Sequence, residues 1–400
     1  MTNTSTVAPL PSIAARMAGV EGSAVREILK LTQQPHVLSL AGGLPAPELF
    51  DVAGLRAAYD RVLDGPQARR HLQYTVTEGE PDLRAALAGL SRSRGLDAVR
   101  DEQVLVTTGS QQALDLVATA VLDPGDVVVV ERPSYLAALQ VFALTGARVV
   151  SVPLDEDGLD PEEVRAAVRR HRAKLVYTVA TFQNPSGVTL PAERRRALAQ
   201  MAAEEGVWVL EDDPYGALRY RGAPVAPIAA AEPERVVYAS SLSKILAPGL
   251  RLGWVVLPPA LRDAVVVAKQ ARDLHTSTVD QCAAAEYLAS GALPPHLERI
   301  RAAYRLRLDA MLGGLAAALP AGSRWTRPEG GMFVWLTLPE GRDTAAELPG
   351  AVREGVAYVP GAPFFAEAPL DHTARVSFAT LEPPQIAEAL RRLGRALAAG

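Results

Sequence analysis

Cysteine is nearly absent from this 400-residue chain, and lysine is almost as scarce. The single cysteine, Cys282, rules out an internal disulfide framework and favours a reducing compartment such as the cytoplasm. Its apolar surroundings, DQCAAAEYL, predict a helix in which this cysteine contributes to packing. The only lysines are Lys30, Lys174, Lys244 and Lys269. A lysine in a short polar loop is therefore a stronger signal here than in a lysine-rich chain.

Long apolar runs are absent too, so no segment is expected to span a membrane. The first residues, MTNTSTVAPLPS, have neither the basic cluster nor the apolar core of a signal peptide. The net charge of −4 gives no reason to expect nucleic acid or an anionic membrane as a partner. The sequence contains no repeats and no low-complexity tracts, and it predicts no metal site. We therefore expect a globular, cytoplasmic protein.

The stretch from Ser241 to Trp254, SLSKILAPGLRLGW, gathers several polar side chains around one lysine. Lys244 stands between the hydroxyls of Ser241 and Ser243, and Arg251 follows seven residues later. The apolar residues VVYAS lead into this stretch, which predicts a loop at the end of a buried strand. The lysine amine could form an imine with a carbonyl cofactor, while the hydroxyls and the arginine hold a phosphate. The alternative is a surface turn with incidental charges.

From residue 103 onward, short apolar runs alternate with helical segments. Seven of these runs predict strands, and some, such as VVVV, VVSV and VWVL, lack any polar alternation. Such strands are buried on both faces, as in a mostly parallel sheet covered by helices. We predict an α/β fold in which a large domain with a mostly parallel seven-stranded sheet is joined to a smaller α+β domain. The predicted divisions are an N-terminal arm with a mobile helix packing on the small domain (1–50), a large domain (51–295) and a small domain (296–400).

Several polar residues stand at the carboxyl ends of the predicted strands, where α/β sheets bind ligands. Gly109, Ser110 and Gln111 occupy a strand-to-helix junction, whose free N–H groups and helix dipole favour a phosphate. This signal is weak by itself because a glycine before a helix is usually a turn. The segment is not a P-loop, since the Gly-Lys-Ser/Thr signature is absent. The other strand-end residues are Tyr135, Asn184, Asp212 and Tyr215.

A pyridine aldehyde that carries a phosphate would use every one of these residues. Asp212 would pair with the pyridine nitrogen and keep it protonated, so that the ring can accept electrons. Tyr215 and Asn184 could hydrogen-bond the phenolic oxygen of the ring, and Tyr135 could stack on its face. The phosphate would be held by Ser110, Gln111, Ser241, Ser243 and Arg251. Asp212 and Asp213 alone would fit a solvated turn better, but the joint pattern favours the cofactor.

Eight motifs extend this pattern over nearly the whole chain. They are SLAGGLPAPELF (39–50), QYxxxxG (73–79), TxGSQQALDL, QNPSG, EDDPY, SxSKxxxPGxRxG, RPEGGMFVWL and RVSFA. Together they resemble the class I/II, fold-type I aminotransferases that use pyridoxal phosphate, and the 2-aminoadipate aminotransferase-like branch in particular. The resemblance implies the cofactor roles given above, with Lys244, Asp212 and Tyr215 as catalytic residues. It also implies that Arg375, assisted by Asn184, binds the substrate α-carboxylate.

The resemblance implies three further contributions to the site. Gly43 would lie beside the substrate as backbone, and Tyr74 would reach the cofactor phosphate across a homodimer. In the 2-aminoadipate branch, a serine and an arginine on the mobile N-terminal helix recognise the substrate side chain. Ser23 and Arg26 match these two positions. A helix cap and a solvated arginine explain the same two residues equally well.

Three positions depart from the pattern of the family. Leu242 stands where an aromatic residue is usual, Thr75 where glycine is common, and Ala180 where proline is frequent. None of these departures removes a catalytic group. Because all three lie near the cofactor in the family, they leave the reaction type less defined than the cofactor.

The predicted function is the exchange of an amino group between an L-amino acid and a 2-oxo acid by a cytoplasmic homodimer. Arg26 favours glutamate and 2-oxoglutarate as one couple, and the second couple is not specified by the sequence. One alternative is another pyridoxal-phosphate reaction on the same fold, namely elimination, decarboxylation or carbon–carbon condensation. A second alternative is a transcription regulator with an aminotransferase-like sensor domain. It is disfavoured because such regulators carry a DNA-binding domain ahead of this region, where only a short, non-basic segment is found.

Overall fold

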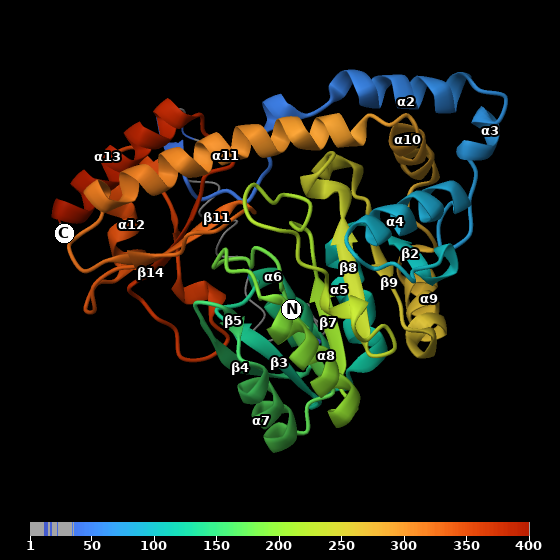
Figure 1. Cartoon of the computed structure of the whole chain (residues 1–400), viewed down its shortest axis with the longest axis horizontal. Helices are drawn as coiled ribbons and strands as arrows, with labels where there is room; N and C mark the ends of the chain where they lie inside the picture. The colour runs from blue at the N-terminus through green and yellow to red at the C-terminus, as the bar shows by residue number, and fades with distance from the viewer. Residues whose placement is uncertain (1–11, 15–16, 18–21, 23–33, 35, 400) are drawn as a thin grey trace, which may run out of the picture.

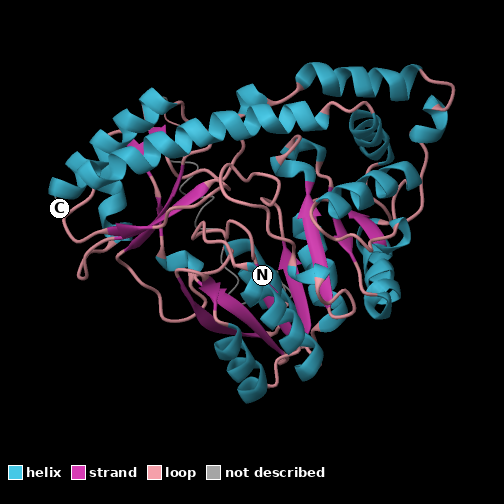
Figure 2. Cartoon of the chain, in the orientation of Figure 1, coloured by secondary structure: helices cyan, strands magenta, loops and turns pink. Residues whose placement is uncertain are grey.

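The computed structural model describes residues 12–14, 17, 22, 34 and 36–399. The predicted N-terminal helix, with Ser23 and Arg26, lies outside the described residues. From residue 36 onward the chain forms an α/β fold with one large sheet, one smaller sheet and a separate pair of short strands (Figures 1 and 2). The predicted fold class is confirmed.

The large sheet has eight strands, one more than predicted. Its order is β2 (Val104–Thr107), β9 (Gly253–Val256), β8 (Val236–Ser241), β7 (Trp208–Asp212), β6 (Leu175–Thr178), β3 (Val127–Arg132), β4 (Arg148–Asp155) and β5 (Gly158–Leu159). The strands from β8 to β4 pair in parallel, whereas β9 is antiparallel to both of its neighbours. The additional strand, β5, pairs antiparallel with β4. The sequence did not predict it because two residues are too short to establish a periodicity.

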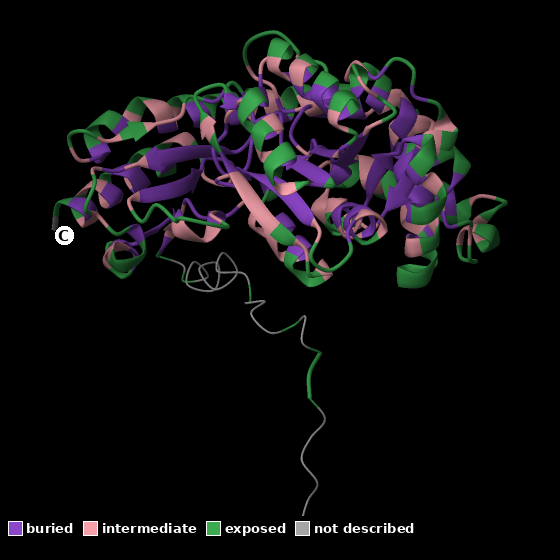
Figure 3. Ribbon diagram, turned by 90° about the horizontal axis from the view of Figure 1, so that it is seen from below, coloured by how far each residue is buried: buried purple, intermediate pink, exposed green. Residues whose placement is uncertain are grey.

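The central strands are buried between helices, as their continuous apolar sequence predicts. All four residues of β6 and the first five residues of β3 are buried. In Figure 3 buried strands fill the interior, and helices with exposed outer sides surround them. The helices of this region are α4 (Pro81–Ser93), α5 (Ser110–Val121), α6 (Leu136–Thr145), α7 (Pro161–His171), α8 (Ala192–Glu205), α9 (Pro259–Asp273) and α10 (Thr278–Ala289). Cys282 lies in α10 and packs with Val62 and Ala283, as predicted.

The C-terminal region contains the smaller sheet, which is antiparallel. Its order is β10 (Arg324–Trp325), β11 (Phe333–Thr337), β14 (Thr373–Ser377) and β13 (Val359–Pro360), accompanied by α12 (Thr344–Arg353) and α13 (Pro383–Ala399). Near the N-terminus, β1 (Leu38–Ser39) pairs in parallel with β12 (Val356–Ala357). The described end of the N-terminal arm therefore lies against the C-terminal region.

A long helix, α11 (Leu293–Ala318), connects the two regions and runs along one side of the molecule (Figure 1). It packs on α13, while α2 (Val52–Asp64), which is followed by the short α3 (Ala68–His71), packs on α10. The predicted boundary at residue 295 falls in the first turn of α11, so one continuous helix links the two regions. The division at residues 50 and 295 stays a prediction. Among the helices of the described residues, none has the length and apolar character needed to cross a membrane.

Candidate active site

Lys244 lies just beyond the carboxyl end of β8, in the 3-10 helix Leu242–Lys244. Ser241 caps this helix, because its hydroxyl oxygen accepts a hydrogen bond from the N–H of Ser243 at 3.0 Å. The Lys244 amine donates a hydrogen bond to the carbonyl oxygen of Gly43 at 2.7 Å. Burial lowers the pKa of Lys244 to about 8, and the positive charges of Arg375 and Arg251 act in the same direction. An amine with a lowered pKa is more available as a nucleophile or base near neutral pH.

Asp212 ends β7 and is buried, so the solvated turn considered for it is wrong. The hydroxyl of Tyr177, on the neighbouring strand β6, donates to its Oδ2 atom at 3.1 Å. The Oδ1 atom is buried and has no hydrogen-bond partner among the described residues. Burial raises the pKa of Asp212 to about 7, and the nearby carboxylates of Asp213 and Glu131 add to the increase. A ligand that brings an N–H group to Oδ1 would satisfy the orphaned acceptor and favour the ionised carboxylate.

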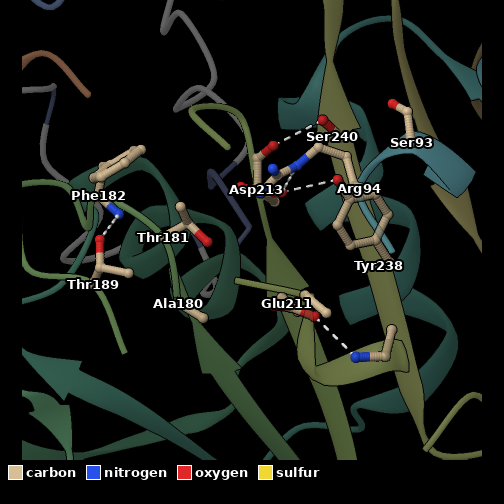
Figure 4. A network of polar contacts seen from close by, with 12 residues as sticks. Ser93, Arg94, Ala180, Thr181, Phe182, Thr189, Glu211, Asp213, Tyr238 and Ser240 are labelled. Carbon is tan, nitrogen blue, oxygen red and sulfur yellow. Dashed lines mark hydrogen bonds and ion pairs between the residues drawn. The ribbon is translucent and has the colours of Figure 1, made fainter. Parts of the chain in front are cut away.

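A second polar network lies behind Asp212. Figure 4 shows the side chains of Arg94 and Asp213 directed toward each other, with Tyr238 and Ser240 beside them on β8. Arg94 pairs with the Asp213 carboxylate at 3.4 Å, and the Tyr238 hydroxyl donates to the same carboxylate at 2.9 Å. Ser240 donates to the Asp213 backbone carbonyl at 2.8 Å. Asp213 is thus a buried anchor for the turn between Asp212 and Tyr215.

Arg375, on β14, connects the smaller sheet to this site. Its guanidinium donates to Oδ1 of Asn184 at 2.9 Å and to the carbonyl oxygen of Ala41 at 2.9 Å. It lies over the Phe333 ring at 4.2 Å and near the Phe364 ring at 5.0 Å, in cation–π contacts. Its Nε atom is buried without a partner in the described part of the chain. One hydrogen-bonding group of the arginine is therefore still available.

Tyr215 completes the group around Asn184 and Arg375. The side-chain amide of Asn184 donates to the Tyr215 hydroxyl at 3.5 Å. The rings of Tyr215 and Phe333 pack edge to face, with centroids 6.0 Å apart. A Cβ atom on Gly43 would lie 3.0 Å from the Phe333 ring, so glycine allows the N-terminal arm to approach closely.

The predicted phosphate residues also lie together, at the N-terminus of α5. Gly109 precedes this helix with φ +78°, a left-handed conformation that favours glycine. A Cβ atom at this position would lie 2.6 Å from Nη2 of Arg251, which donates to the carbonyl oxygen of Thr108 at 3.3 Å. Ser241 donates to the hydroxyl of Ser243 at 2.8 Å. Ser110 and Gln111 form the first turn of α5, where backbone N–H groups are free to bind an anion.

The two remaining predicted tyrosines differ in position. Tyr135 precedes α6, and burial raises its pKa to about 12, with the Asp212 charge as the next cause. Tyr74 stands apart from the cluster, because it is 78% exposed and its ring packs edge-on against His275. Sequence reasoning missed Tyr177, Phe333 and Phe364. The tyrosine in LVYT, the sequence of β6, was a signal for the first. Phe333 stands in the RPEGGMFVWL motif, but nothing in the sequence gave it or Phe364 a place in the site.

The family model for class I and II aminotransferases matches residues 54–393 of the chain. The chain belongs to this family. It is 44% identical to the aromatic-amino-acid aminotransferase 1 of Thermococcus litoralis, over 95% of this chain and 92% of that protein. It is also 44% identical to the 2-aminoadipate transaminase of Thermus thermophilus, over 94% of each chain. The solved structure of an alpha-aminoadipate aminotransferase from the same organism, complexed with N-(5'-phosphopyridoxyl)-L-leucine, matches with TM-score 0.89 and 42% identity, covering 97% of both chains.

The aminotransferase therefore uses pyridoxal phosphate to exchange an amino group between an amino acid and a 2-oxo acid. The residues present fit this cofactor. The orphaned Oδ1 of Asp212 matches a protonated pyridine nitrogen, and the amine of Lys244 lies in the same cluster. The close approach of Gly109 to Arg251 forms a cradle that a Cβ atom would fill and that suits a phosphate.

Proposed function

We propose that glutamate and 2-oxoglutarate are one substrate couple of this aminotransferase, and that it works as a cytoplasmic homodimer with shared active sites. Lys244, Asp212 and Tyr215 are proposed as its catalytic residues. The assignment of the catalytic residues rests on two observations. Oδ1 of Asp212 has no hydrogen-bond partner among the described residues, and the amine of Lys244, whose pKa is lowered, belongs to the same cluster. The single cysteine of the chain supports a reducing compartment.

The proposed catalytic roles follow from these positions. When bound, pyridoxal phosphate supplies an electron sink for the bond that breaks at the substrate α-carbon. Lys244 removes the proton from this α-carbon, for which a lowered pKa is suited. Asp212 keeps a proton on the ring nitrogen. Tyr215 and Asn184 would hold the phenolic oxygen by hydrogen bonds, and Tyr135 would lie against the face of the ring.

The other proposed contacts bind two anionic groups, the α-carboxylate of the substrate and the phosphate of the cofactor. Arg375 binds the α-carboxylate of the substrate with Asn184, and its Nε atom, which has no partner among the described residues, supports this role. The backbone of Gly43 lies beside the substrate, since its carbonyl oxygen already contacts Lys244. The phosphate is bound by the side chains and N–H groups of Gly109, Ser110, Gln111, Ser241, Ser243 and Arg251, and by Tyr74 of a second chain.

The proposed glutamate couple depends on Arg26, which lies outside the described residues, together with Ser23. A charge-assisted hydrogen bond from this arginine to a distal carboxylate would be worth about 1.5–3 kcal/mol. We therefore expect Arg26→Ala to lower kcat/KM for glutamate and 2-aminoadipate by about 10- to 100-fold. For leucine and aromatic amino acids, which have no distal carboxylate, we expect little change.

The experiment is a panel of single-turnover assays in which amino acids convert the bound cofactor to its amine form and 2-oxo acids reverse the conversion. It also separates transamination from elimination or decarboxylation, which leave the cofactor in the aldehyde form. Arg56→Ala, on α2 in the described part of the chain, is the matched control and should leave all substrates unaffected. Equal losses on both substrate classes in Arg26→Ala, or no conversion by glutamate in the wild type, would contradict the proposed couple.

The proposed homodimer is supported by the loop that carries Tyr74. Leu72 is 69% exposed and Val76 is 53% exposed, so three large side chains of one loop face outward. Three exposed apolar side chains close together in the sequence support an interaction surface at this loop. We expect Tyr74→Ala subunits, impaired in phosphate binding, to regain activity when mixed with inactive Lys244→Ala subunits. One site of each mixed dimer then takes its lysine from the first chain and its tyrosine from the second.

The complementation is measured as activity of purified mixed dimers carrying two different affinity tags. The control mixes Tyr74→Ala subunits with the double variant Tyr74→Ala/Lys244→Ala, which offers no intact combination and should show no recovery. If verified dimers of the two single variants also fail to recover activity, each site is built from one chain.

A further inference from the structure

Lys269 is a fully buried lysine that none of the roles above uses. It lies on α9, four residues before the helix ends at Asp273, and lysines are almost never buried unless their charge is paired. Its amine donates to Oε1 of Gln112 at 2.9 Å and to the Thr276 hydroxyl at 3.0 Å. It also forms an ion pair with Asp273 at 3.0 Å. All three N–H donors of the ammonium therefore have a partner.

The partners of Lys269 hold Thr108, the residue that precedes Gly109. Oε1 of Gln112 accepts the backbone N–H of Thr108 at 2.7 Å. Oδ2 of Asp273 accepts the Thr108 hydroxyl at 2.8 Å and the side-chain amide of Gln112 at 2.7 Å. The N–H and hydroxyl groups of Thr108 are thus both fixed by groups that the buried ammonium holds.

Thr108 in turn supports the cradle that is assigned to the phosphate. Its carbonyl oxygen accepts a hydrogen bond from Arg251, and the next two residues, Gly109 and Ser110, are the N-cap and the first residue of α5. A shift of Thr108 would move the arginine and the first N–H groups of the helix together. The network behind the loop therefore controls how well these donors converge on one anion.

We propose that Lys269 is a positioning residue for the cofactor phosphate, which it does not itself contact. The inference rests on the proposed phosphate-binding role of Gly109, Ser110 and Arg251. The ammonium acts in two ways. It anchors Gln112 and Asp273 against Thr108, and it neutralises a carboxylate that would otherwise repel the phosphate dianion.

The test compares pyridoxal phosphate with pyridoxal, which has the same ring and aldehyde but no phosphate. Both are titrated into apoprotein, and the dissociation constants are measured from the absorbance of the bound ligand. We expect Lys269→Met to weaken binding of pyridoxal phosphate by about 10- to 100-fold, as for the loss of a charge-assisted hydrogen bond. Binding of pyridoxal should be unchanged, because its contacts lie elsewhere in the site.

The matched control is Lys174→Met, which removes a half-exposed lysine paired with Asp126 and should leave both ligands unaffected. The double variant Lys269→Met/Asp273→Asn removes both charges of the pair and should recover part of the lost affinity. Equal weakening of both ligands by Lys269→Met, or no weakening of either, would overturn the proposal.

Two further variants keep the test decisive. If circular dichroism shows that Lys269→Met does not fold, Thr276→Val replaces it, since this nearly isosteric change removes a hydroxyl that contacts both the ammonium and the Thr108 hydroxyl. It should give a smaller but still phosphate-selective loss, and an unselective loss or none would overturn the proposal. Arg251→Met tests the underlying site. If Arg251→Met binds both ligands with wild-type affinity, the phosphate site itself is misplaced. If Arg251→Met loses affinity for pyridoxal phosphate alone and Lys269→Met loses none, only the role of Lys269 is overturned.

Discussion

Replacing Lys244 by alanine is expected to abolish turnover while the fold and the phosphate contacts persist. The variant lacks both the amine that bonds the cofactor and the base that moves the α-proton, so we expect kcat to fall by at least about 100- to 10,000-fold. Circular dichroism should be unchanged, because Lys244 contributes one hydrogen bond, to Gly43, and no ion pair among the described residues.

The measurement is kcat for amino-group transfer, together with mass spectrometry after borohydride reduction. In the wild type, reduction should leave the cofactor covalently attached to Lys244, and in Lys244→Ala no lysine should carry it. Lys174→Ala is the control because this lysine lies on the surface, paired with Asp126 and Asp123. Near wild-type turnover in Lys244→Ala would remove the basis of the proposed site.

Residues at the ends of strands could be predicted from the sequence because continuous apolar runs lead directly to them. Asp212 and Ser241 end the buried strands β7 and β8, and Gly109 follows β2 by two residues. The neighbouring strands β7 and β8 are parallel and end at the same edge of the sheet. Strand β2 runs in the same direction as β8, because both are antiparallel to β9, which lies between them. The chemistry of these residues could therefore be combined before any contact was known. The same reasoning explains why the seven longer strands were predicted and the two-residue β5 was not.

Contacts between distant segments could not be predicted in this way. Arg375 binds the carbonyl oxygen of Ala41, 334 residues earlier, and Lys244 binds that of Gly43, 201 residues earlier. Each contact depends on how β14 and the N-terminal arm pack against the large sheet, which periodicity does not encode. The pair of Arg94 and the buried Asp213 is a similar case, because an arginine at a helix end and the second aspartate of EDDPY each fit a solvated surface when read alone.

Replacing Asp212 by alanine is expected to slow α-proton removal far more than it weakens substrate binding. The carboxylate stabilises a proton on the ring nitrogen, and this proton matters most when negative charge moves into the ring in the transition state. Asp212 is well placed for this because it is buried and rigidly held by Tyr177. We expect a loss of about 100- to 1000-fold in kcat, comparable to the removal of one preorganised electrostatic group from an active site.

The division of this effect between kcat and KM decides what Asp212 does. Removing an interaction that strengthens only in the transition state lowers kcat and kcat/KM equally, whereas removing one that merely binds substrate raises KM. The kinetic isotope effect with α-deuterated substrate should also rise in Asp212→Ala, because proton removal becomes the slow step. Asp263→Ala, which changes an aspartate that is 97% exposed on α9, should alter none of these quantities. A raised KM with unchanged kcat in Asp212→Ala would assign the buried carboxylate to substrate binding, and the ring nitrogen would then be protonated by another group or not at all.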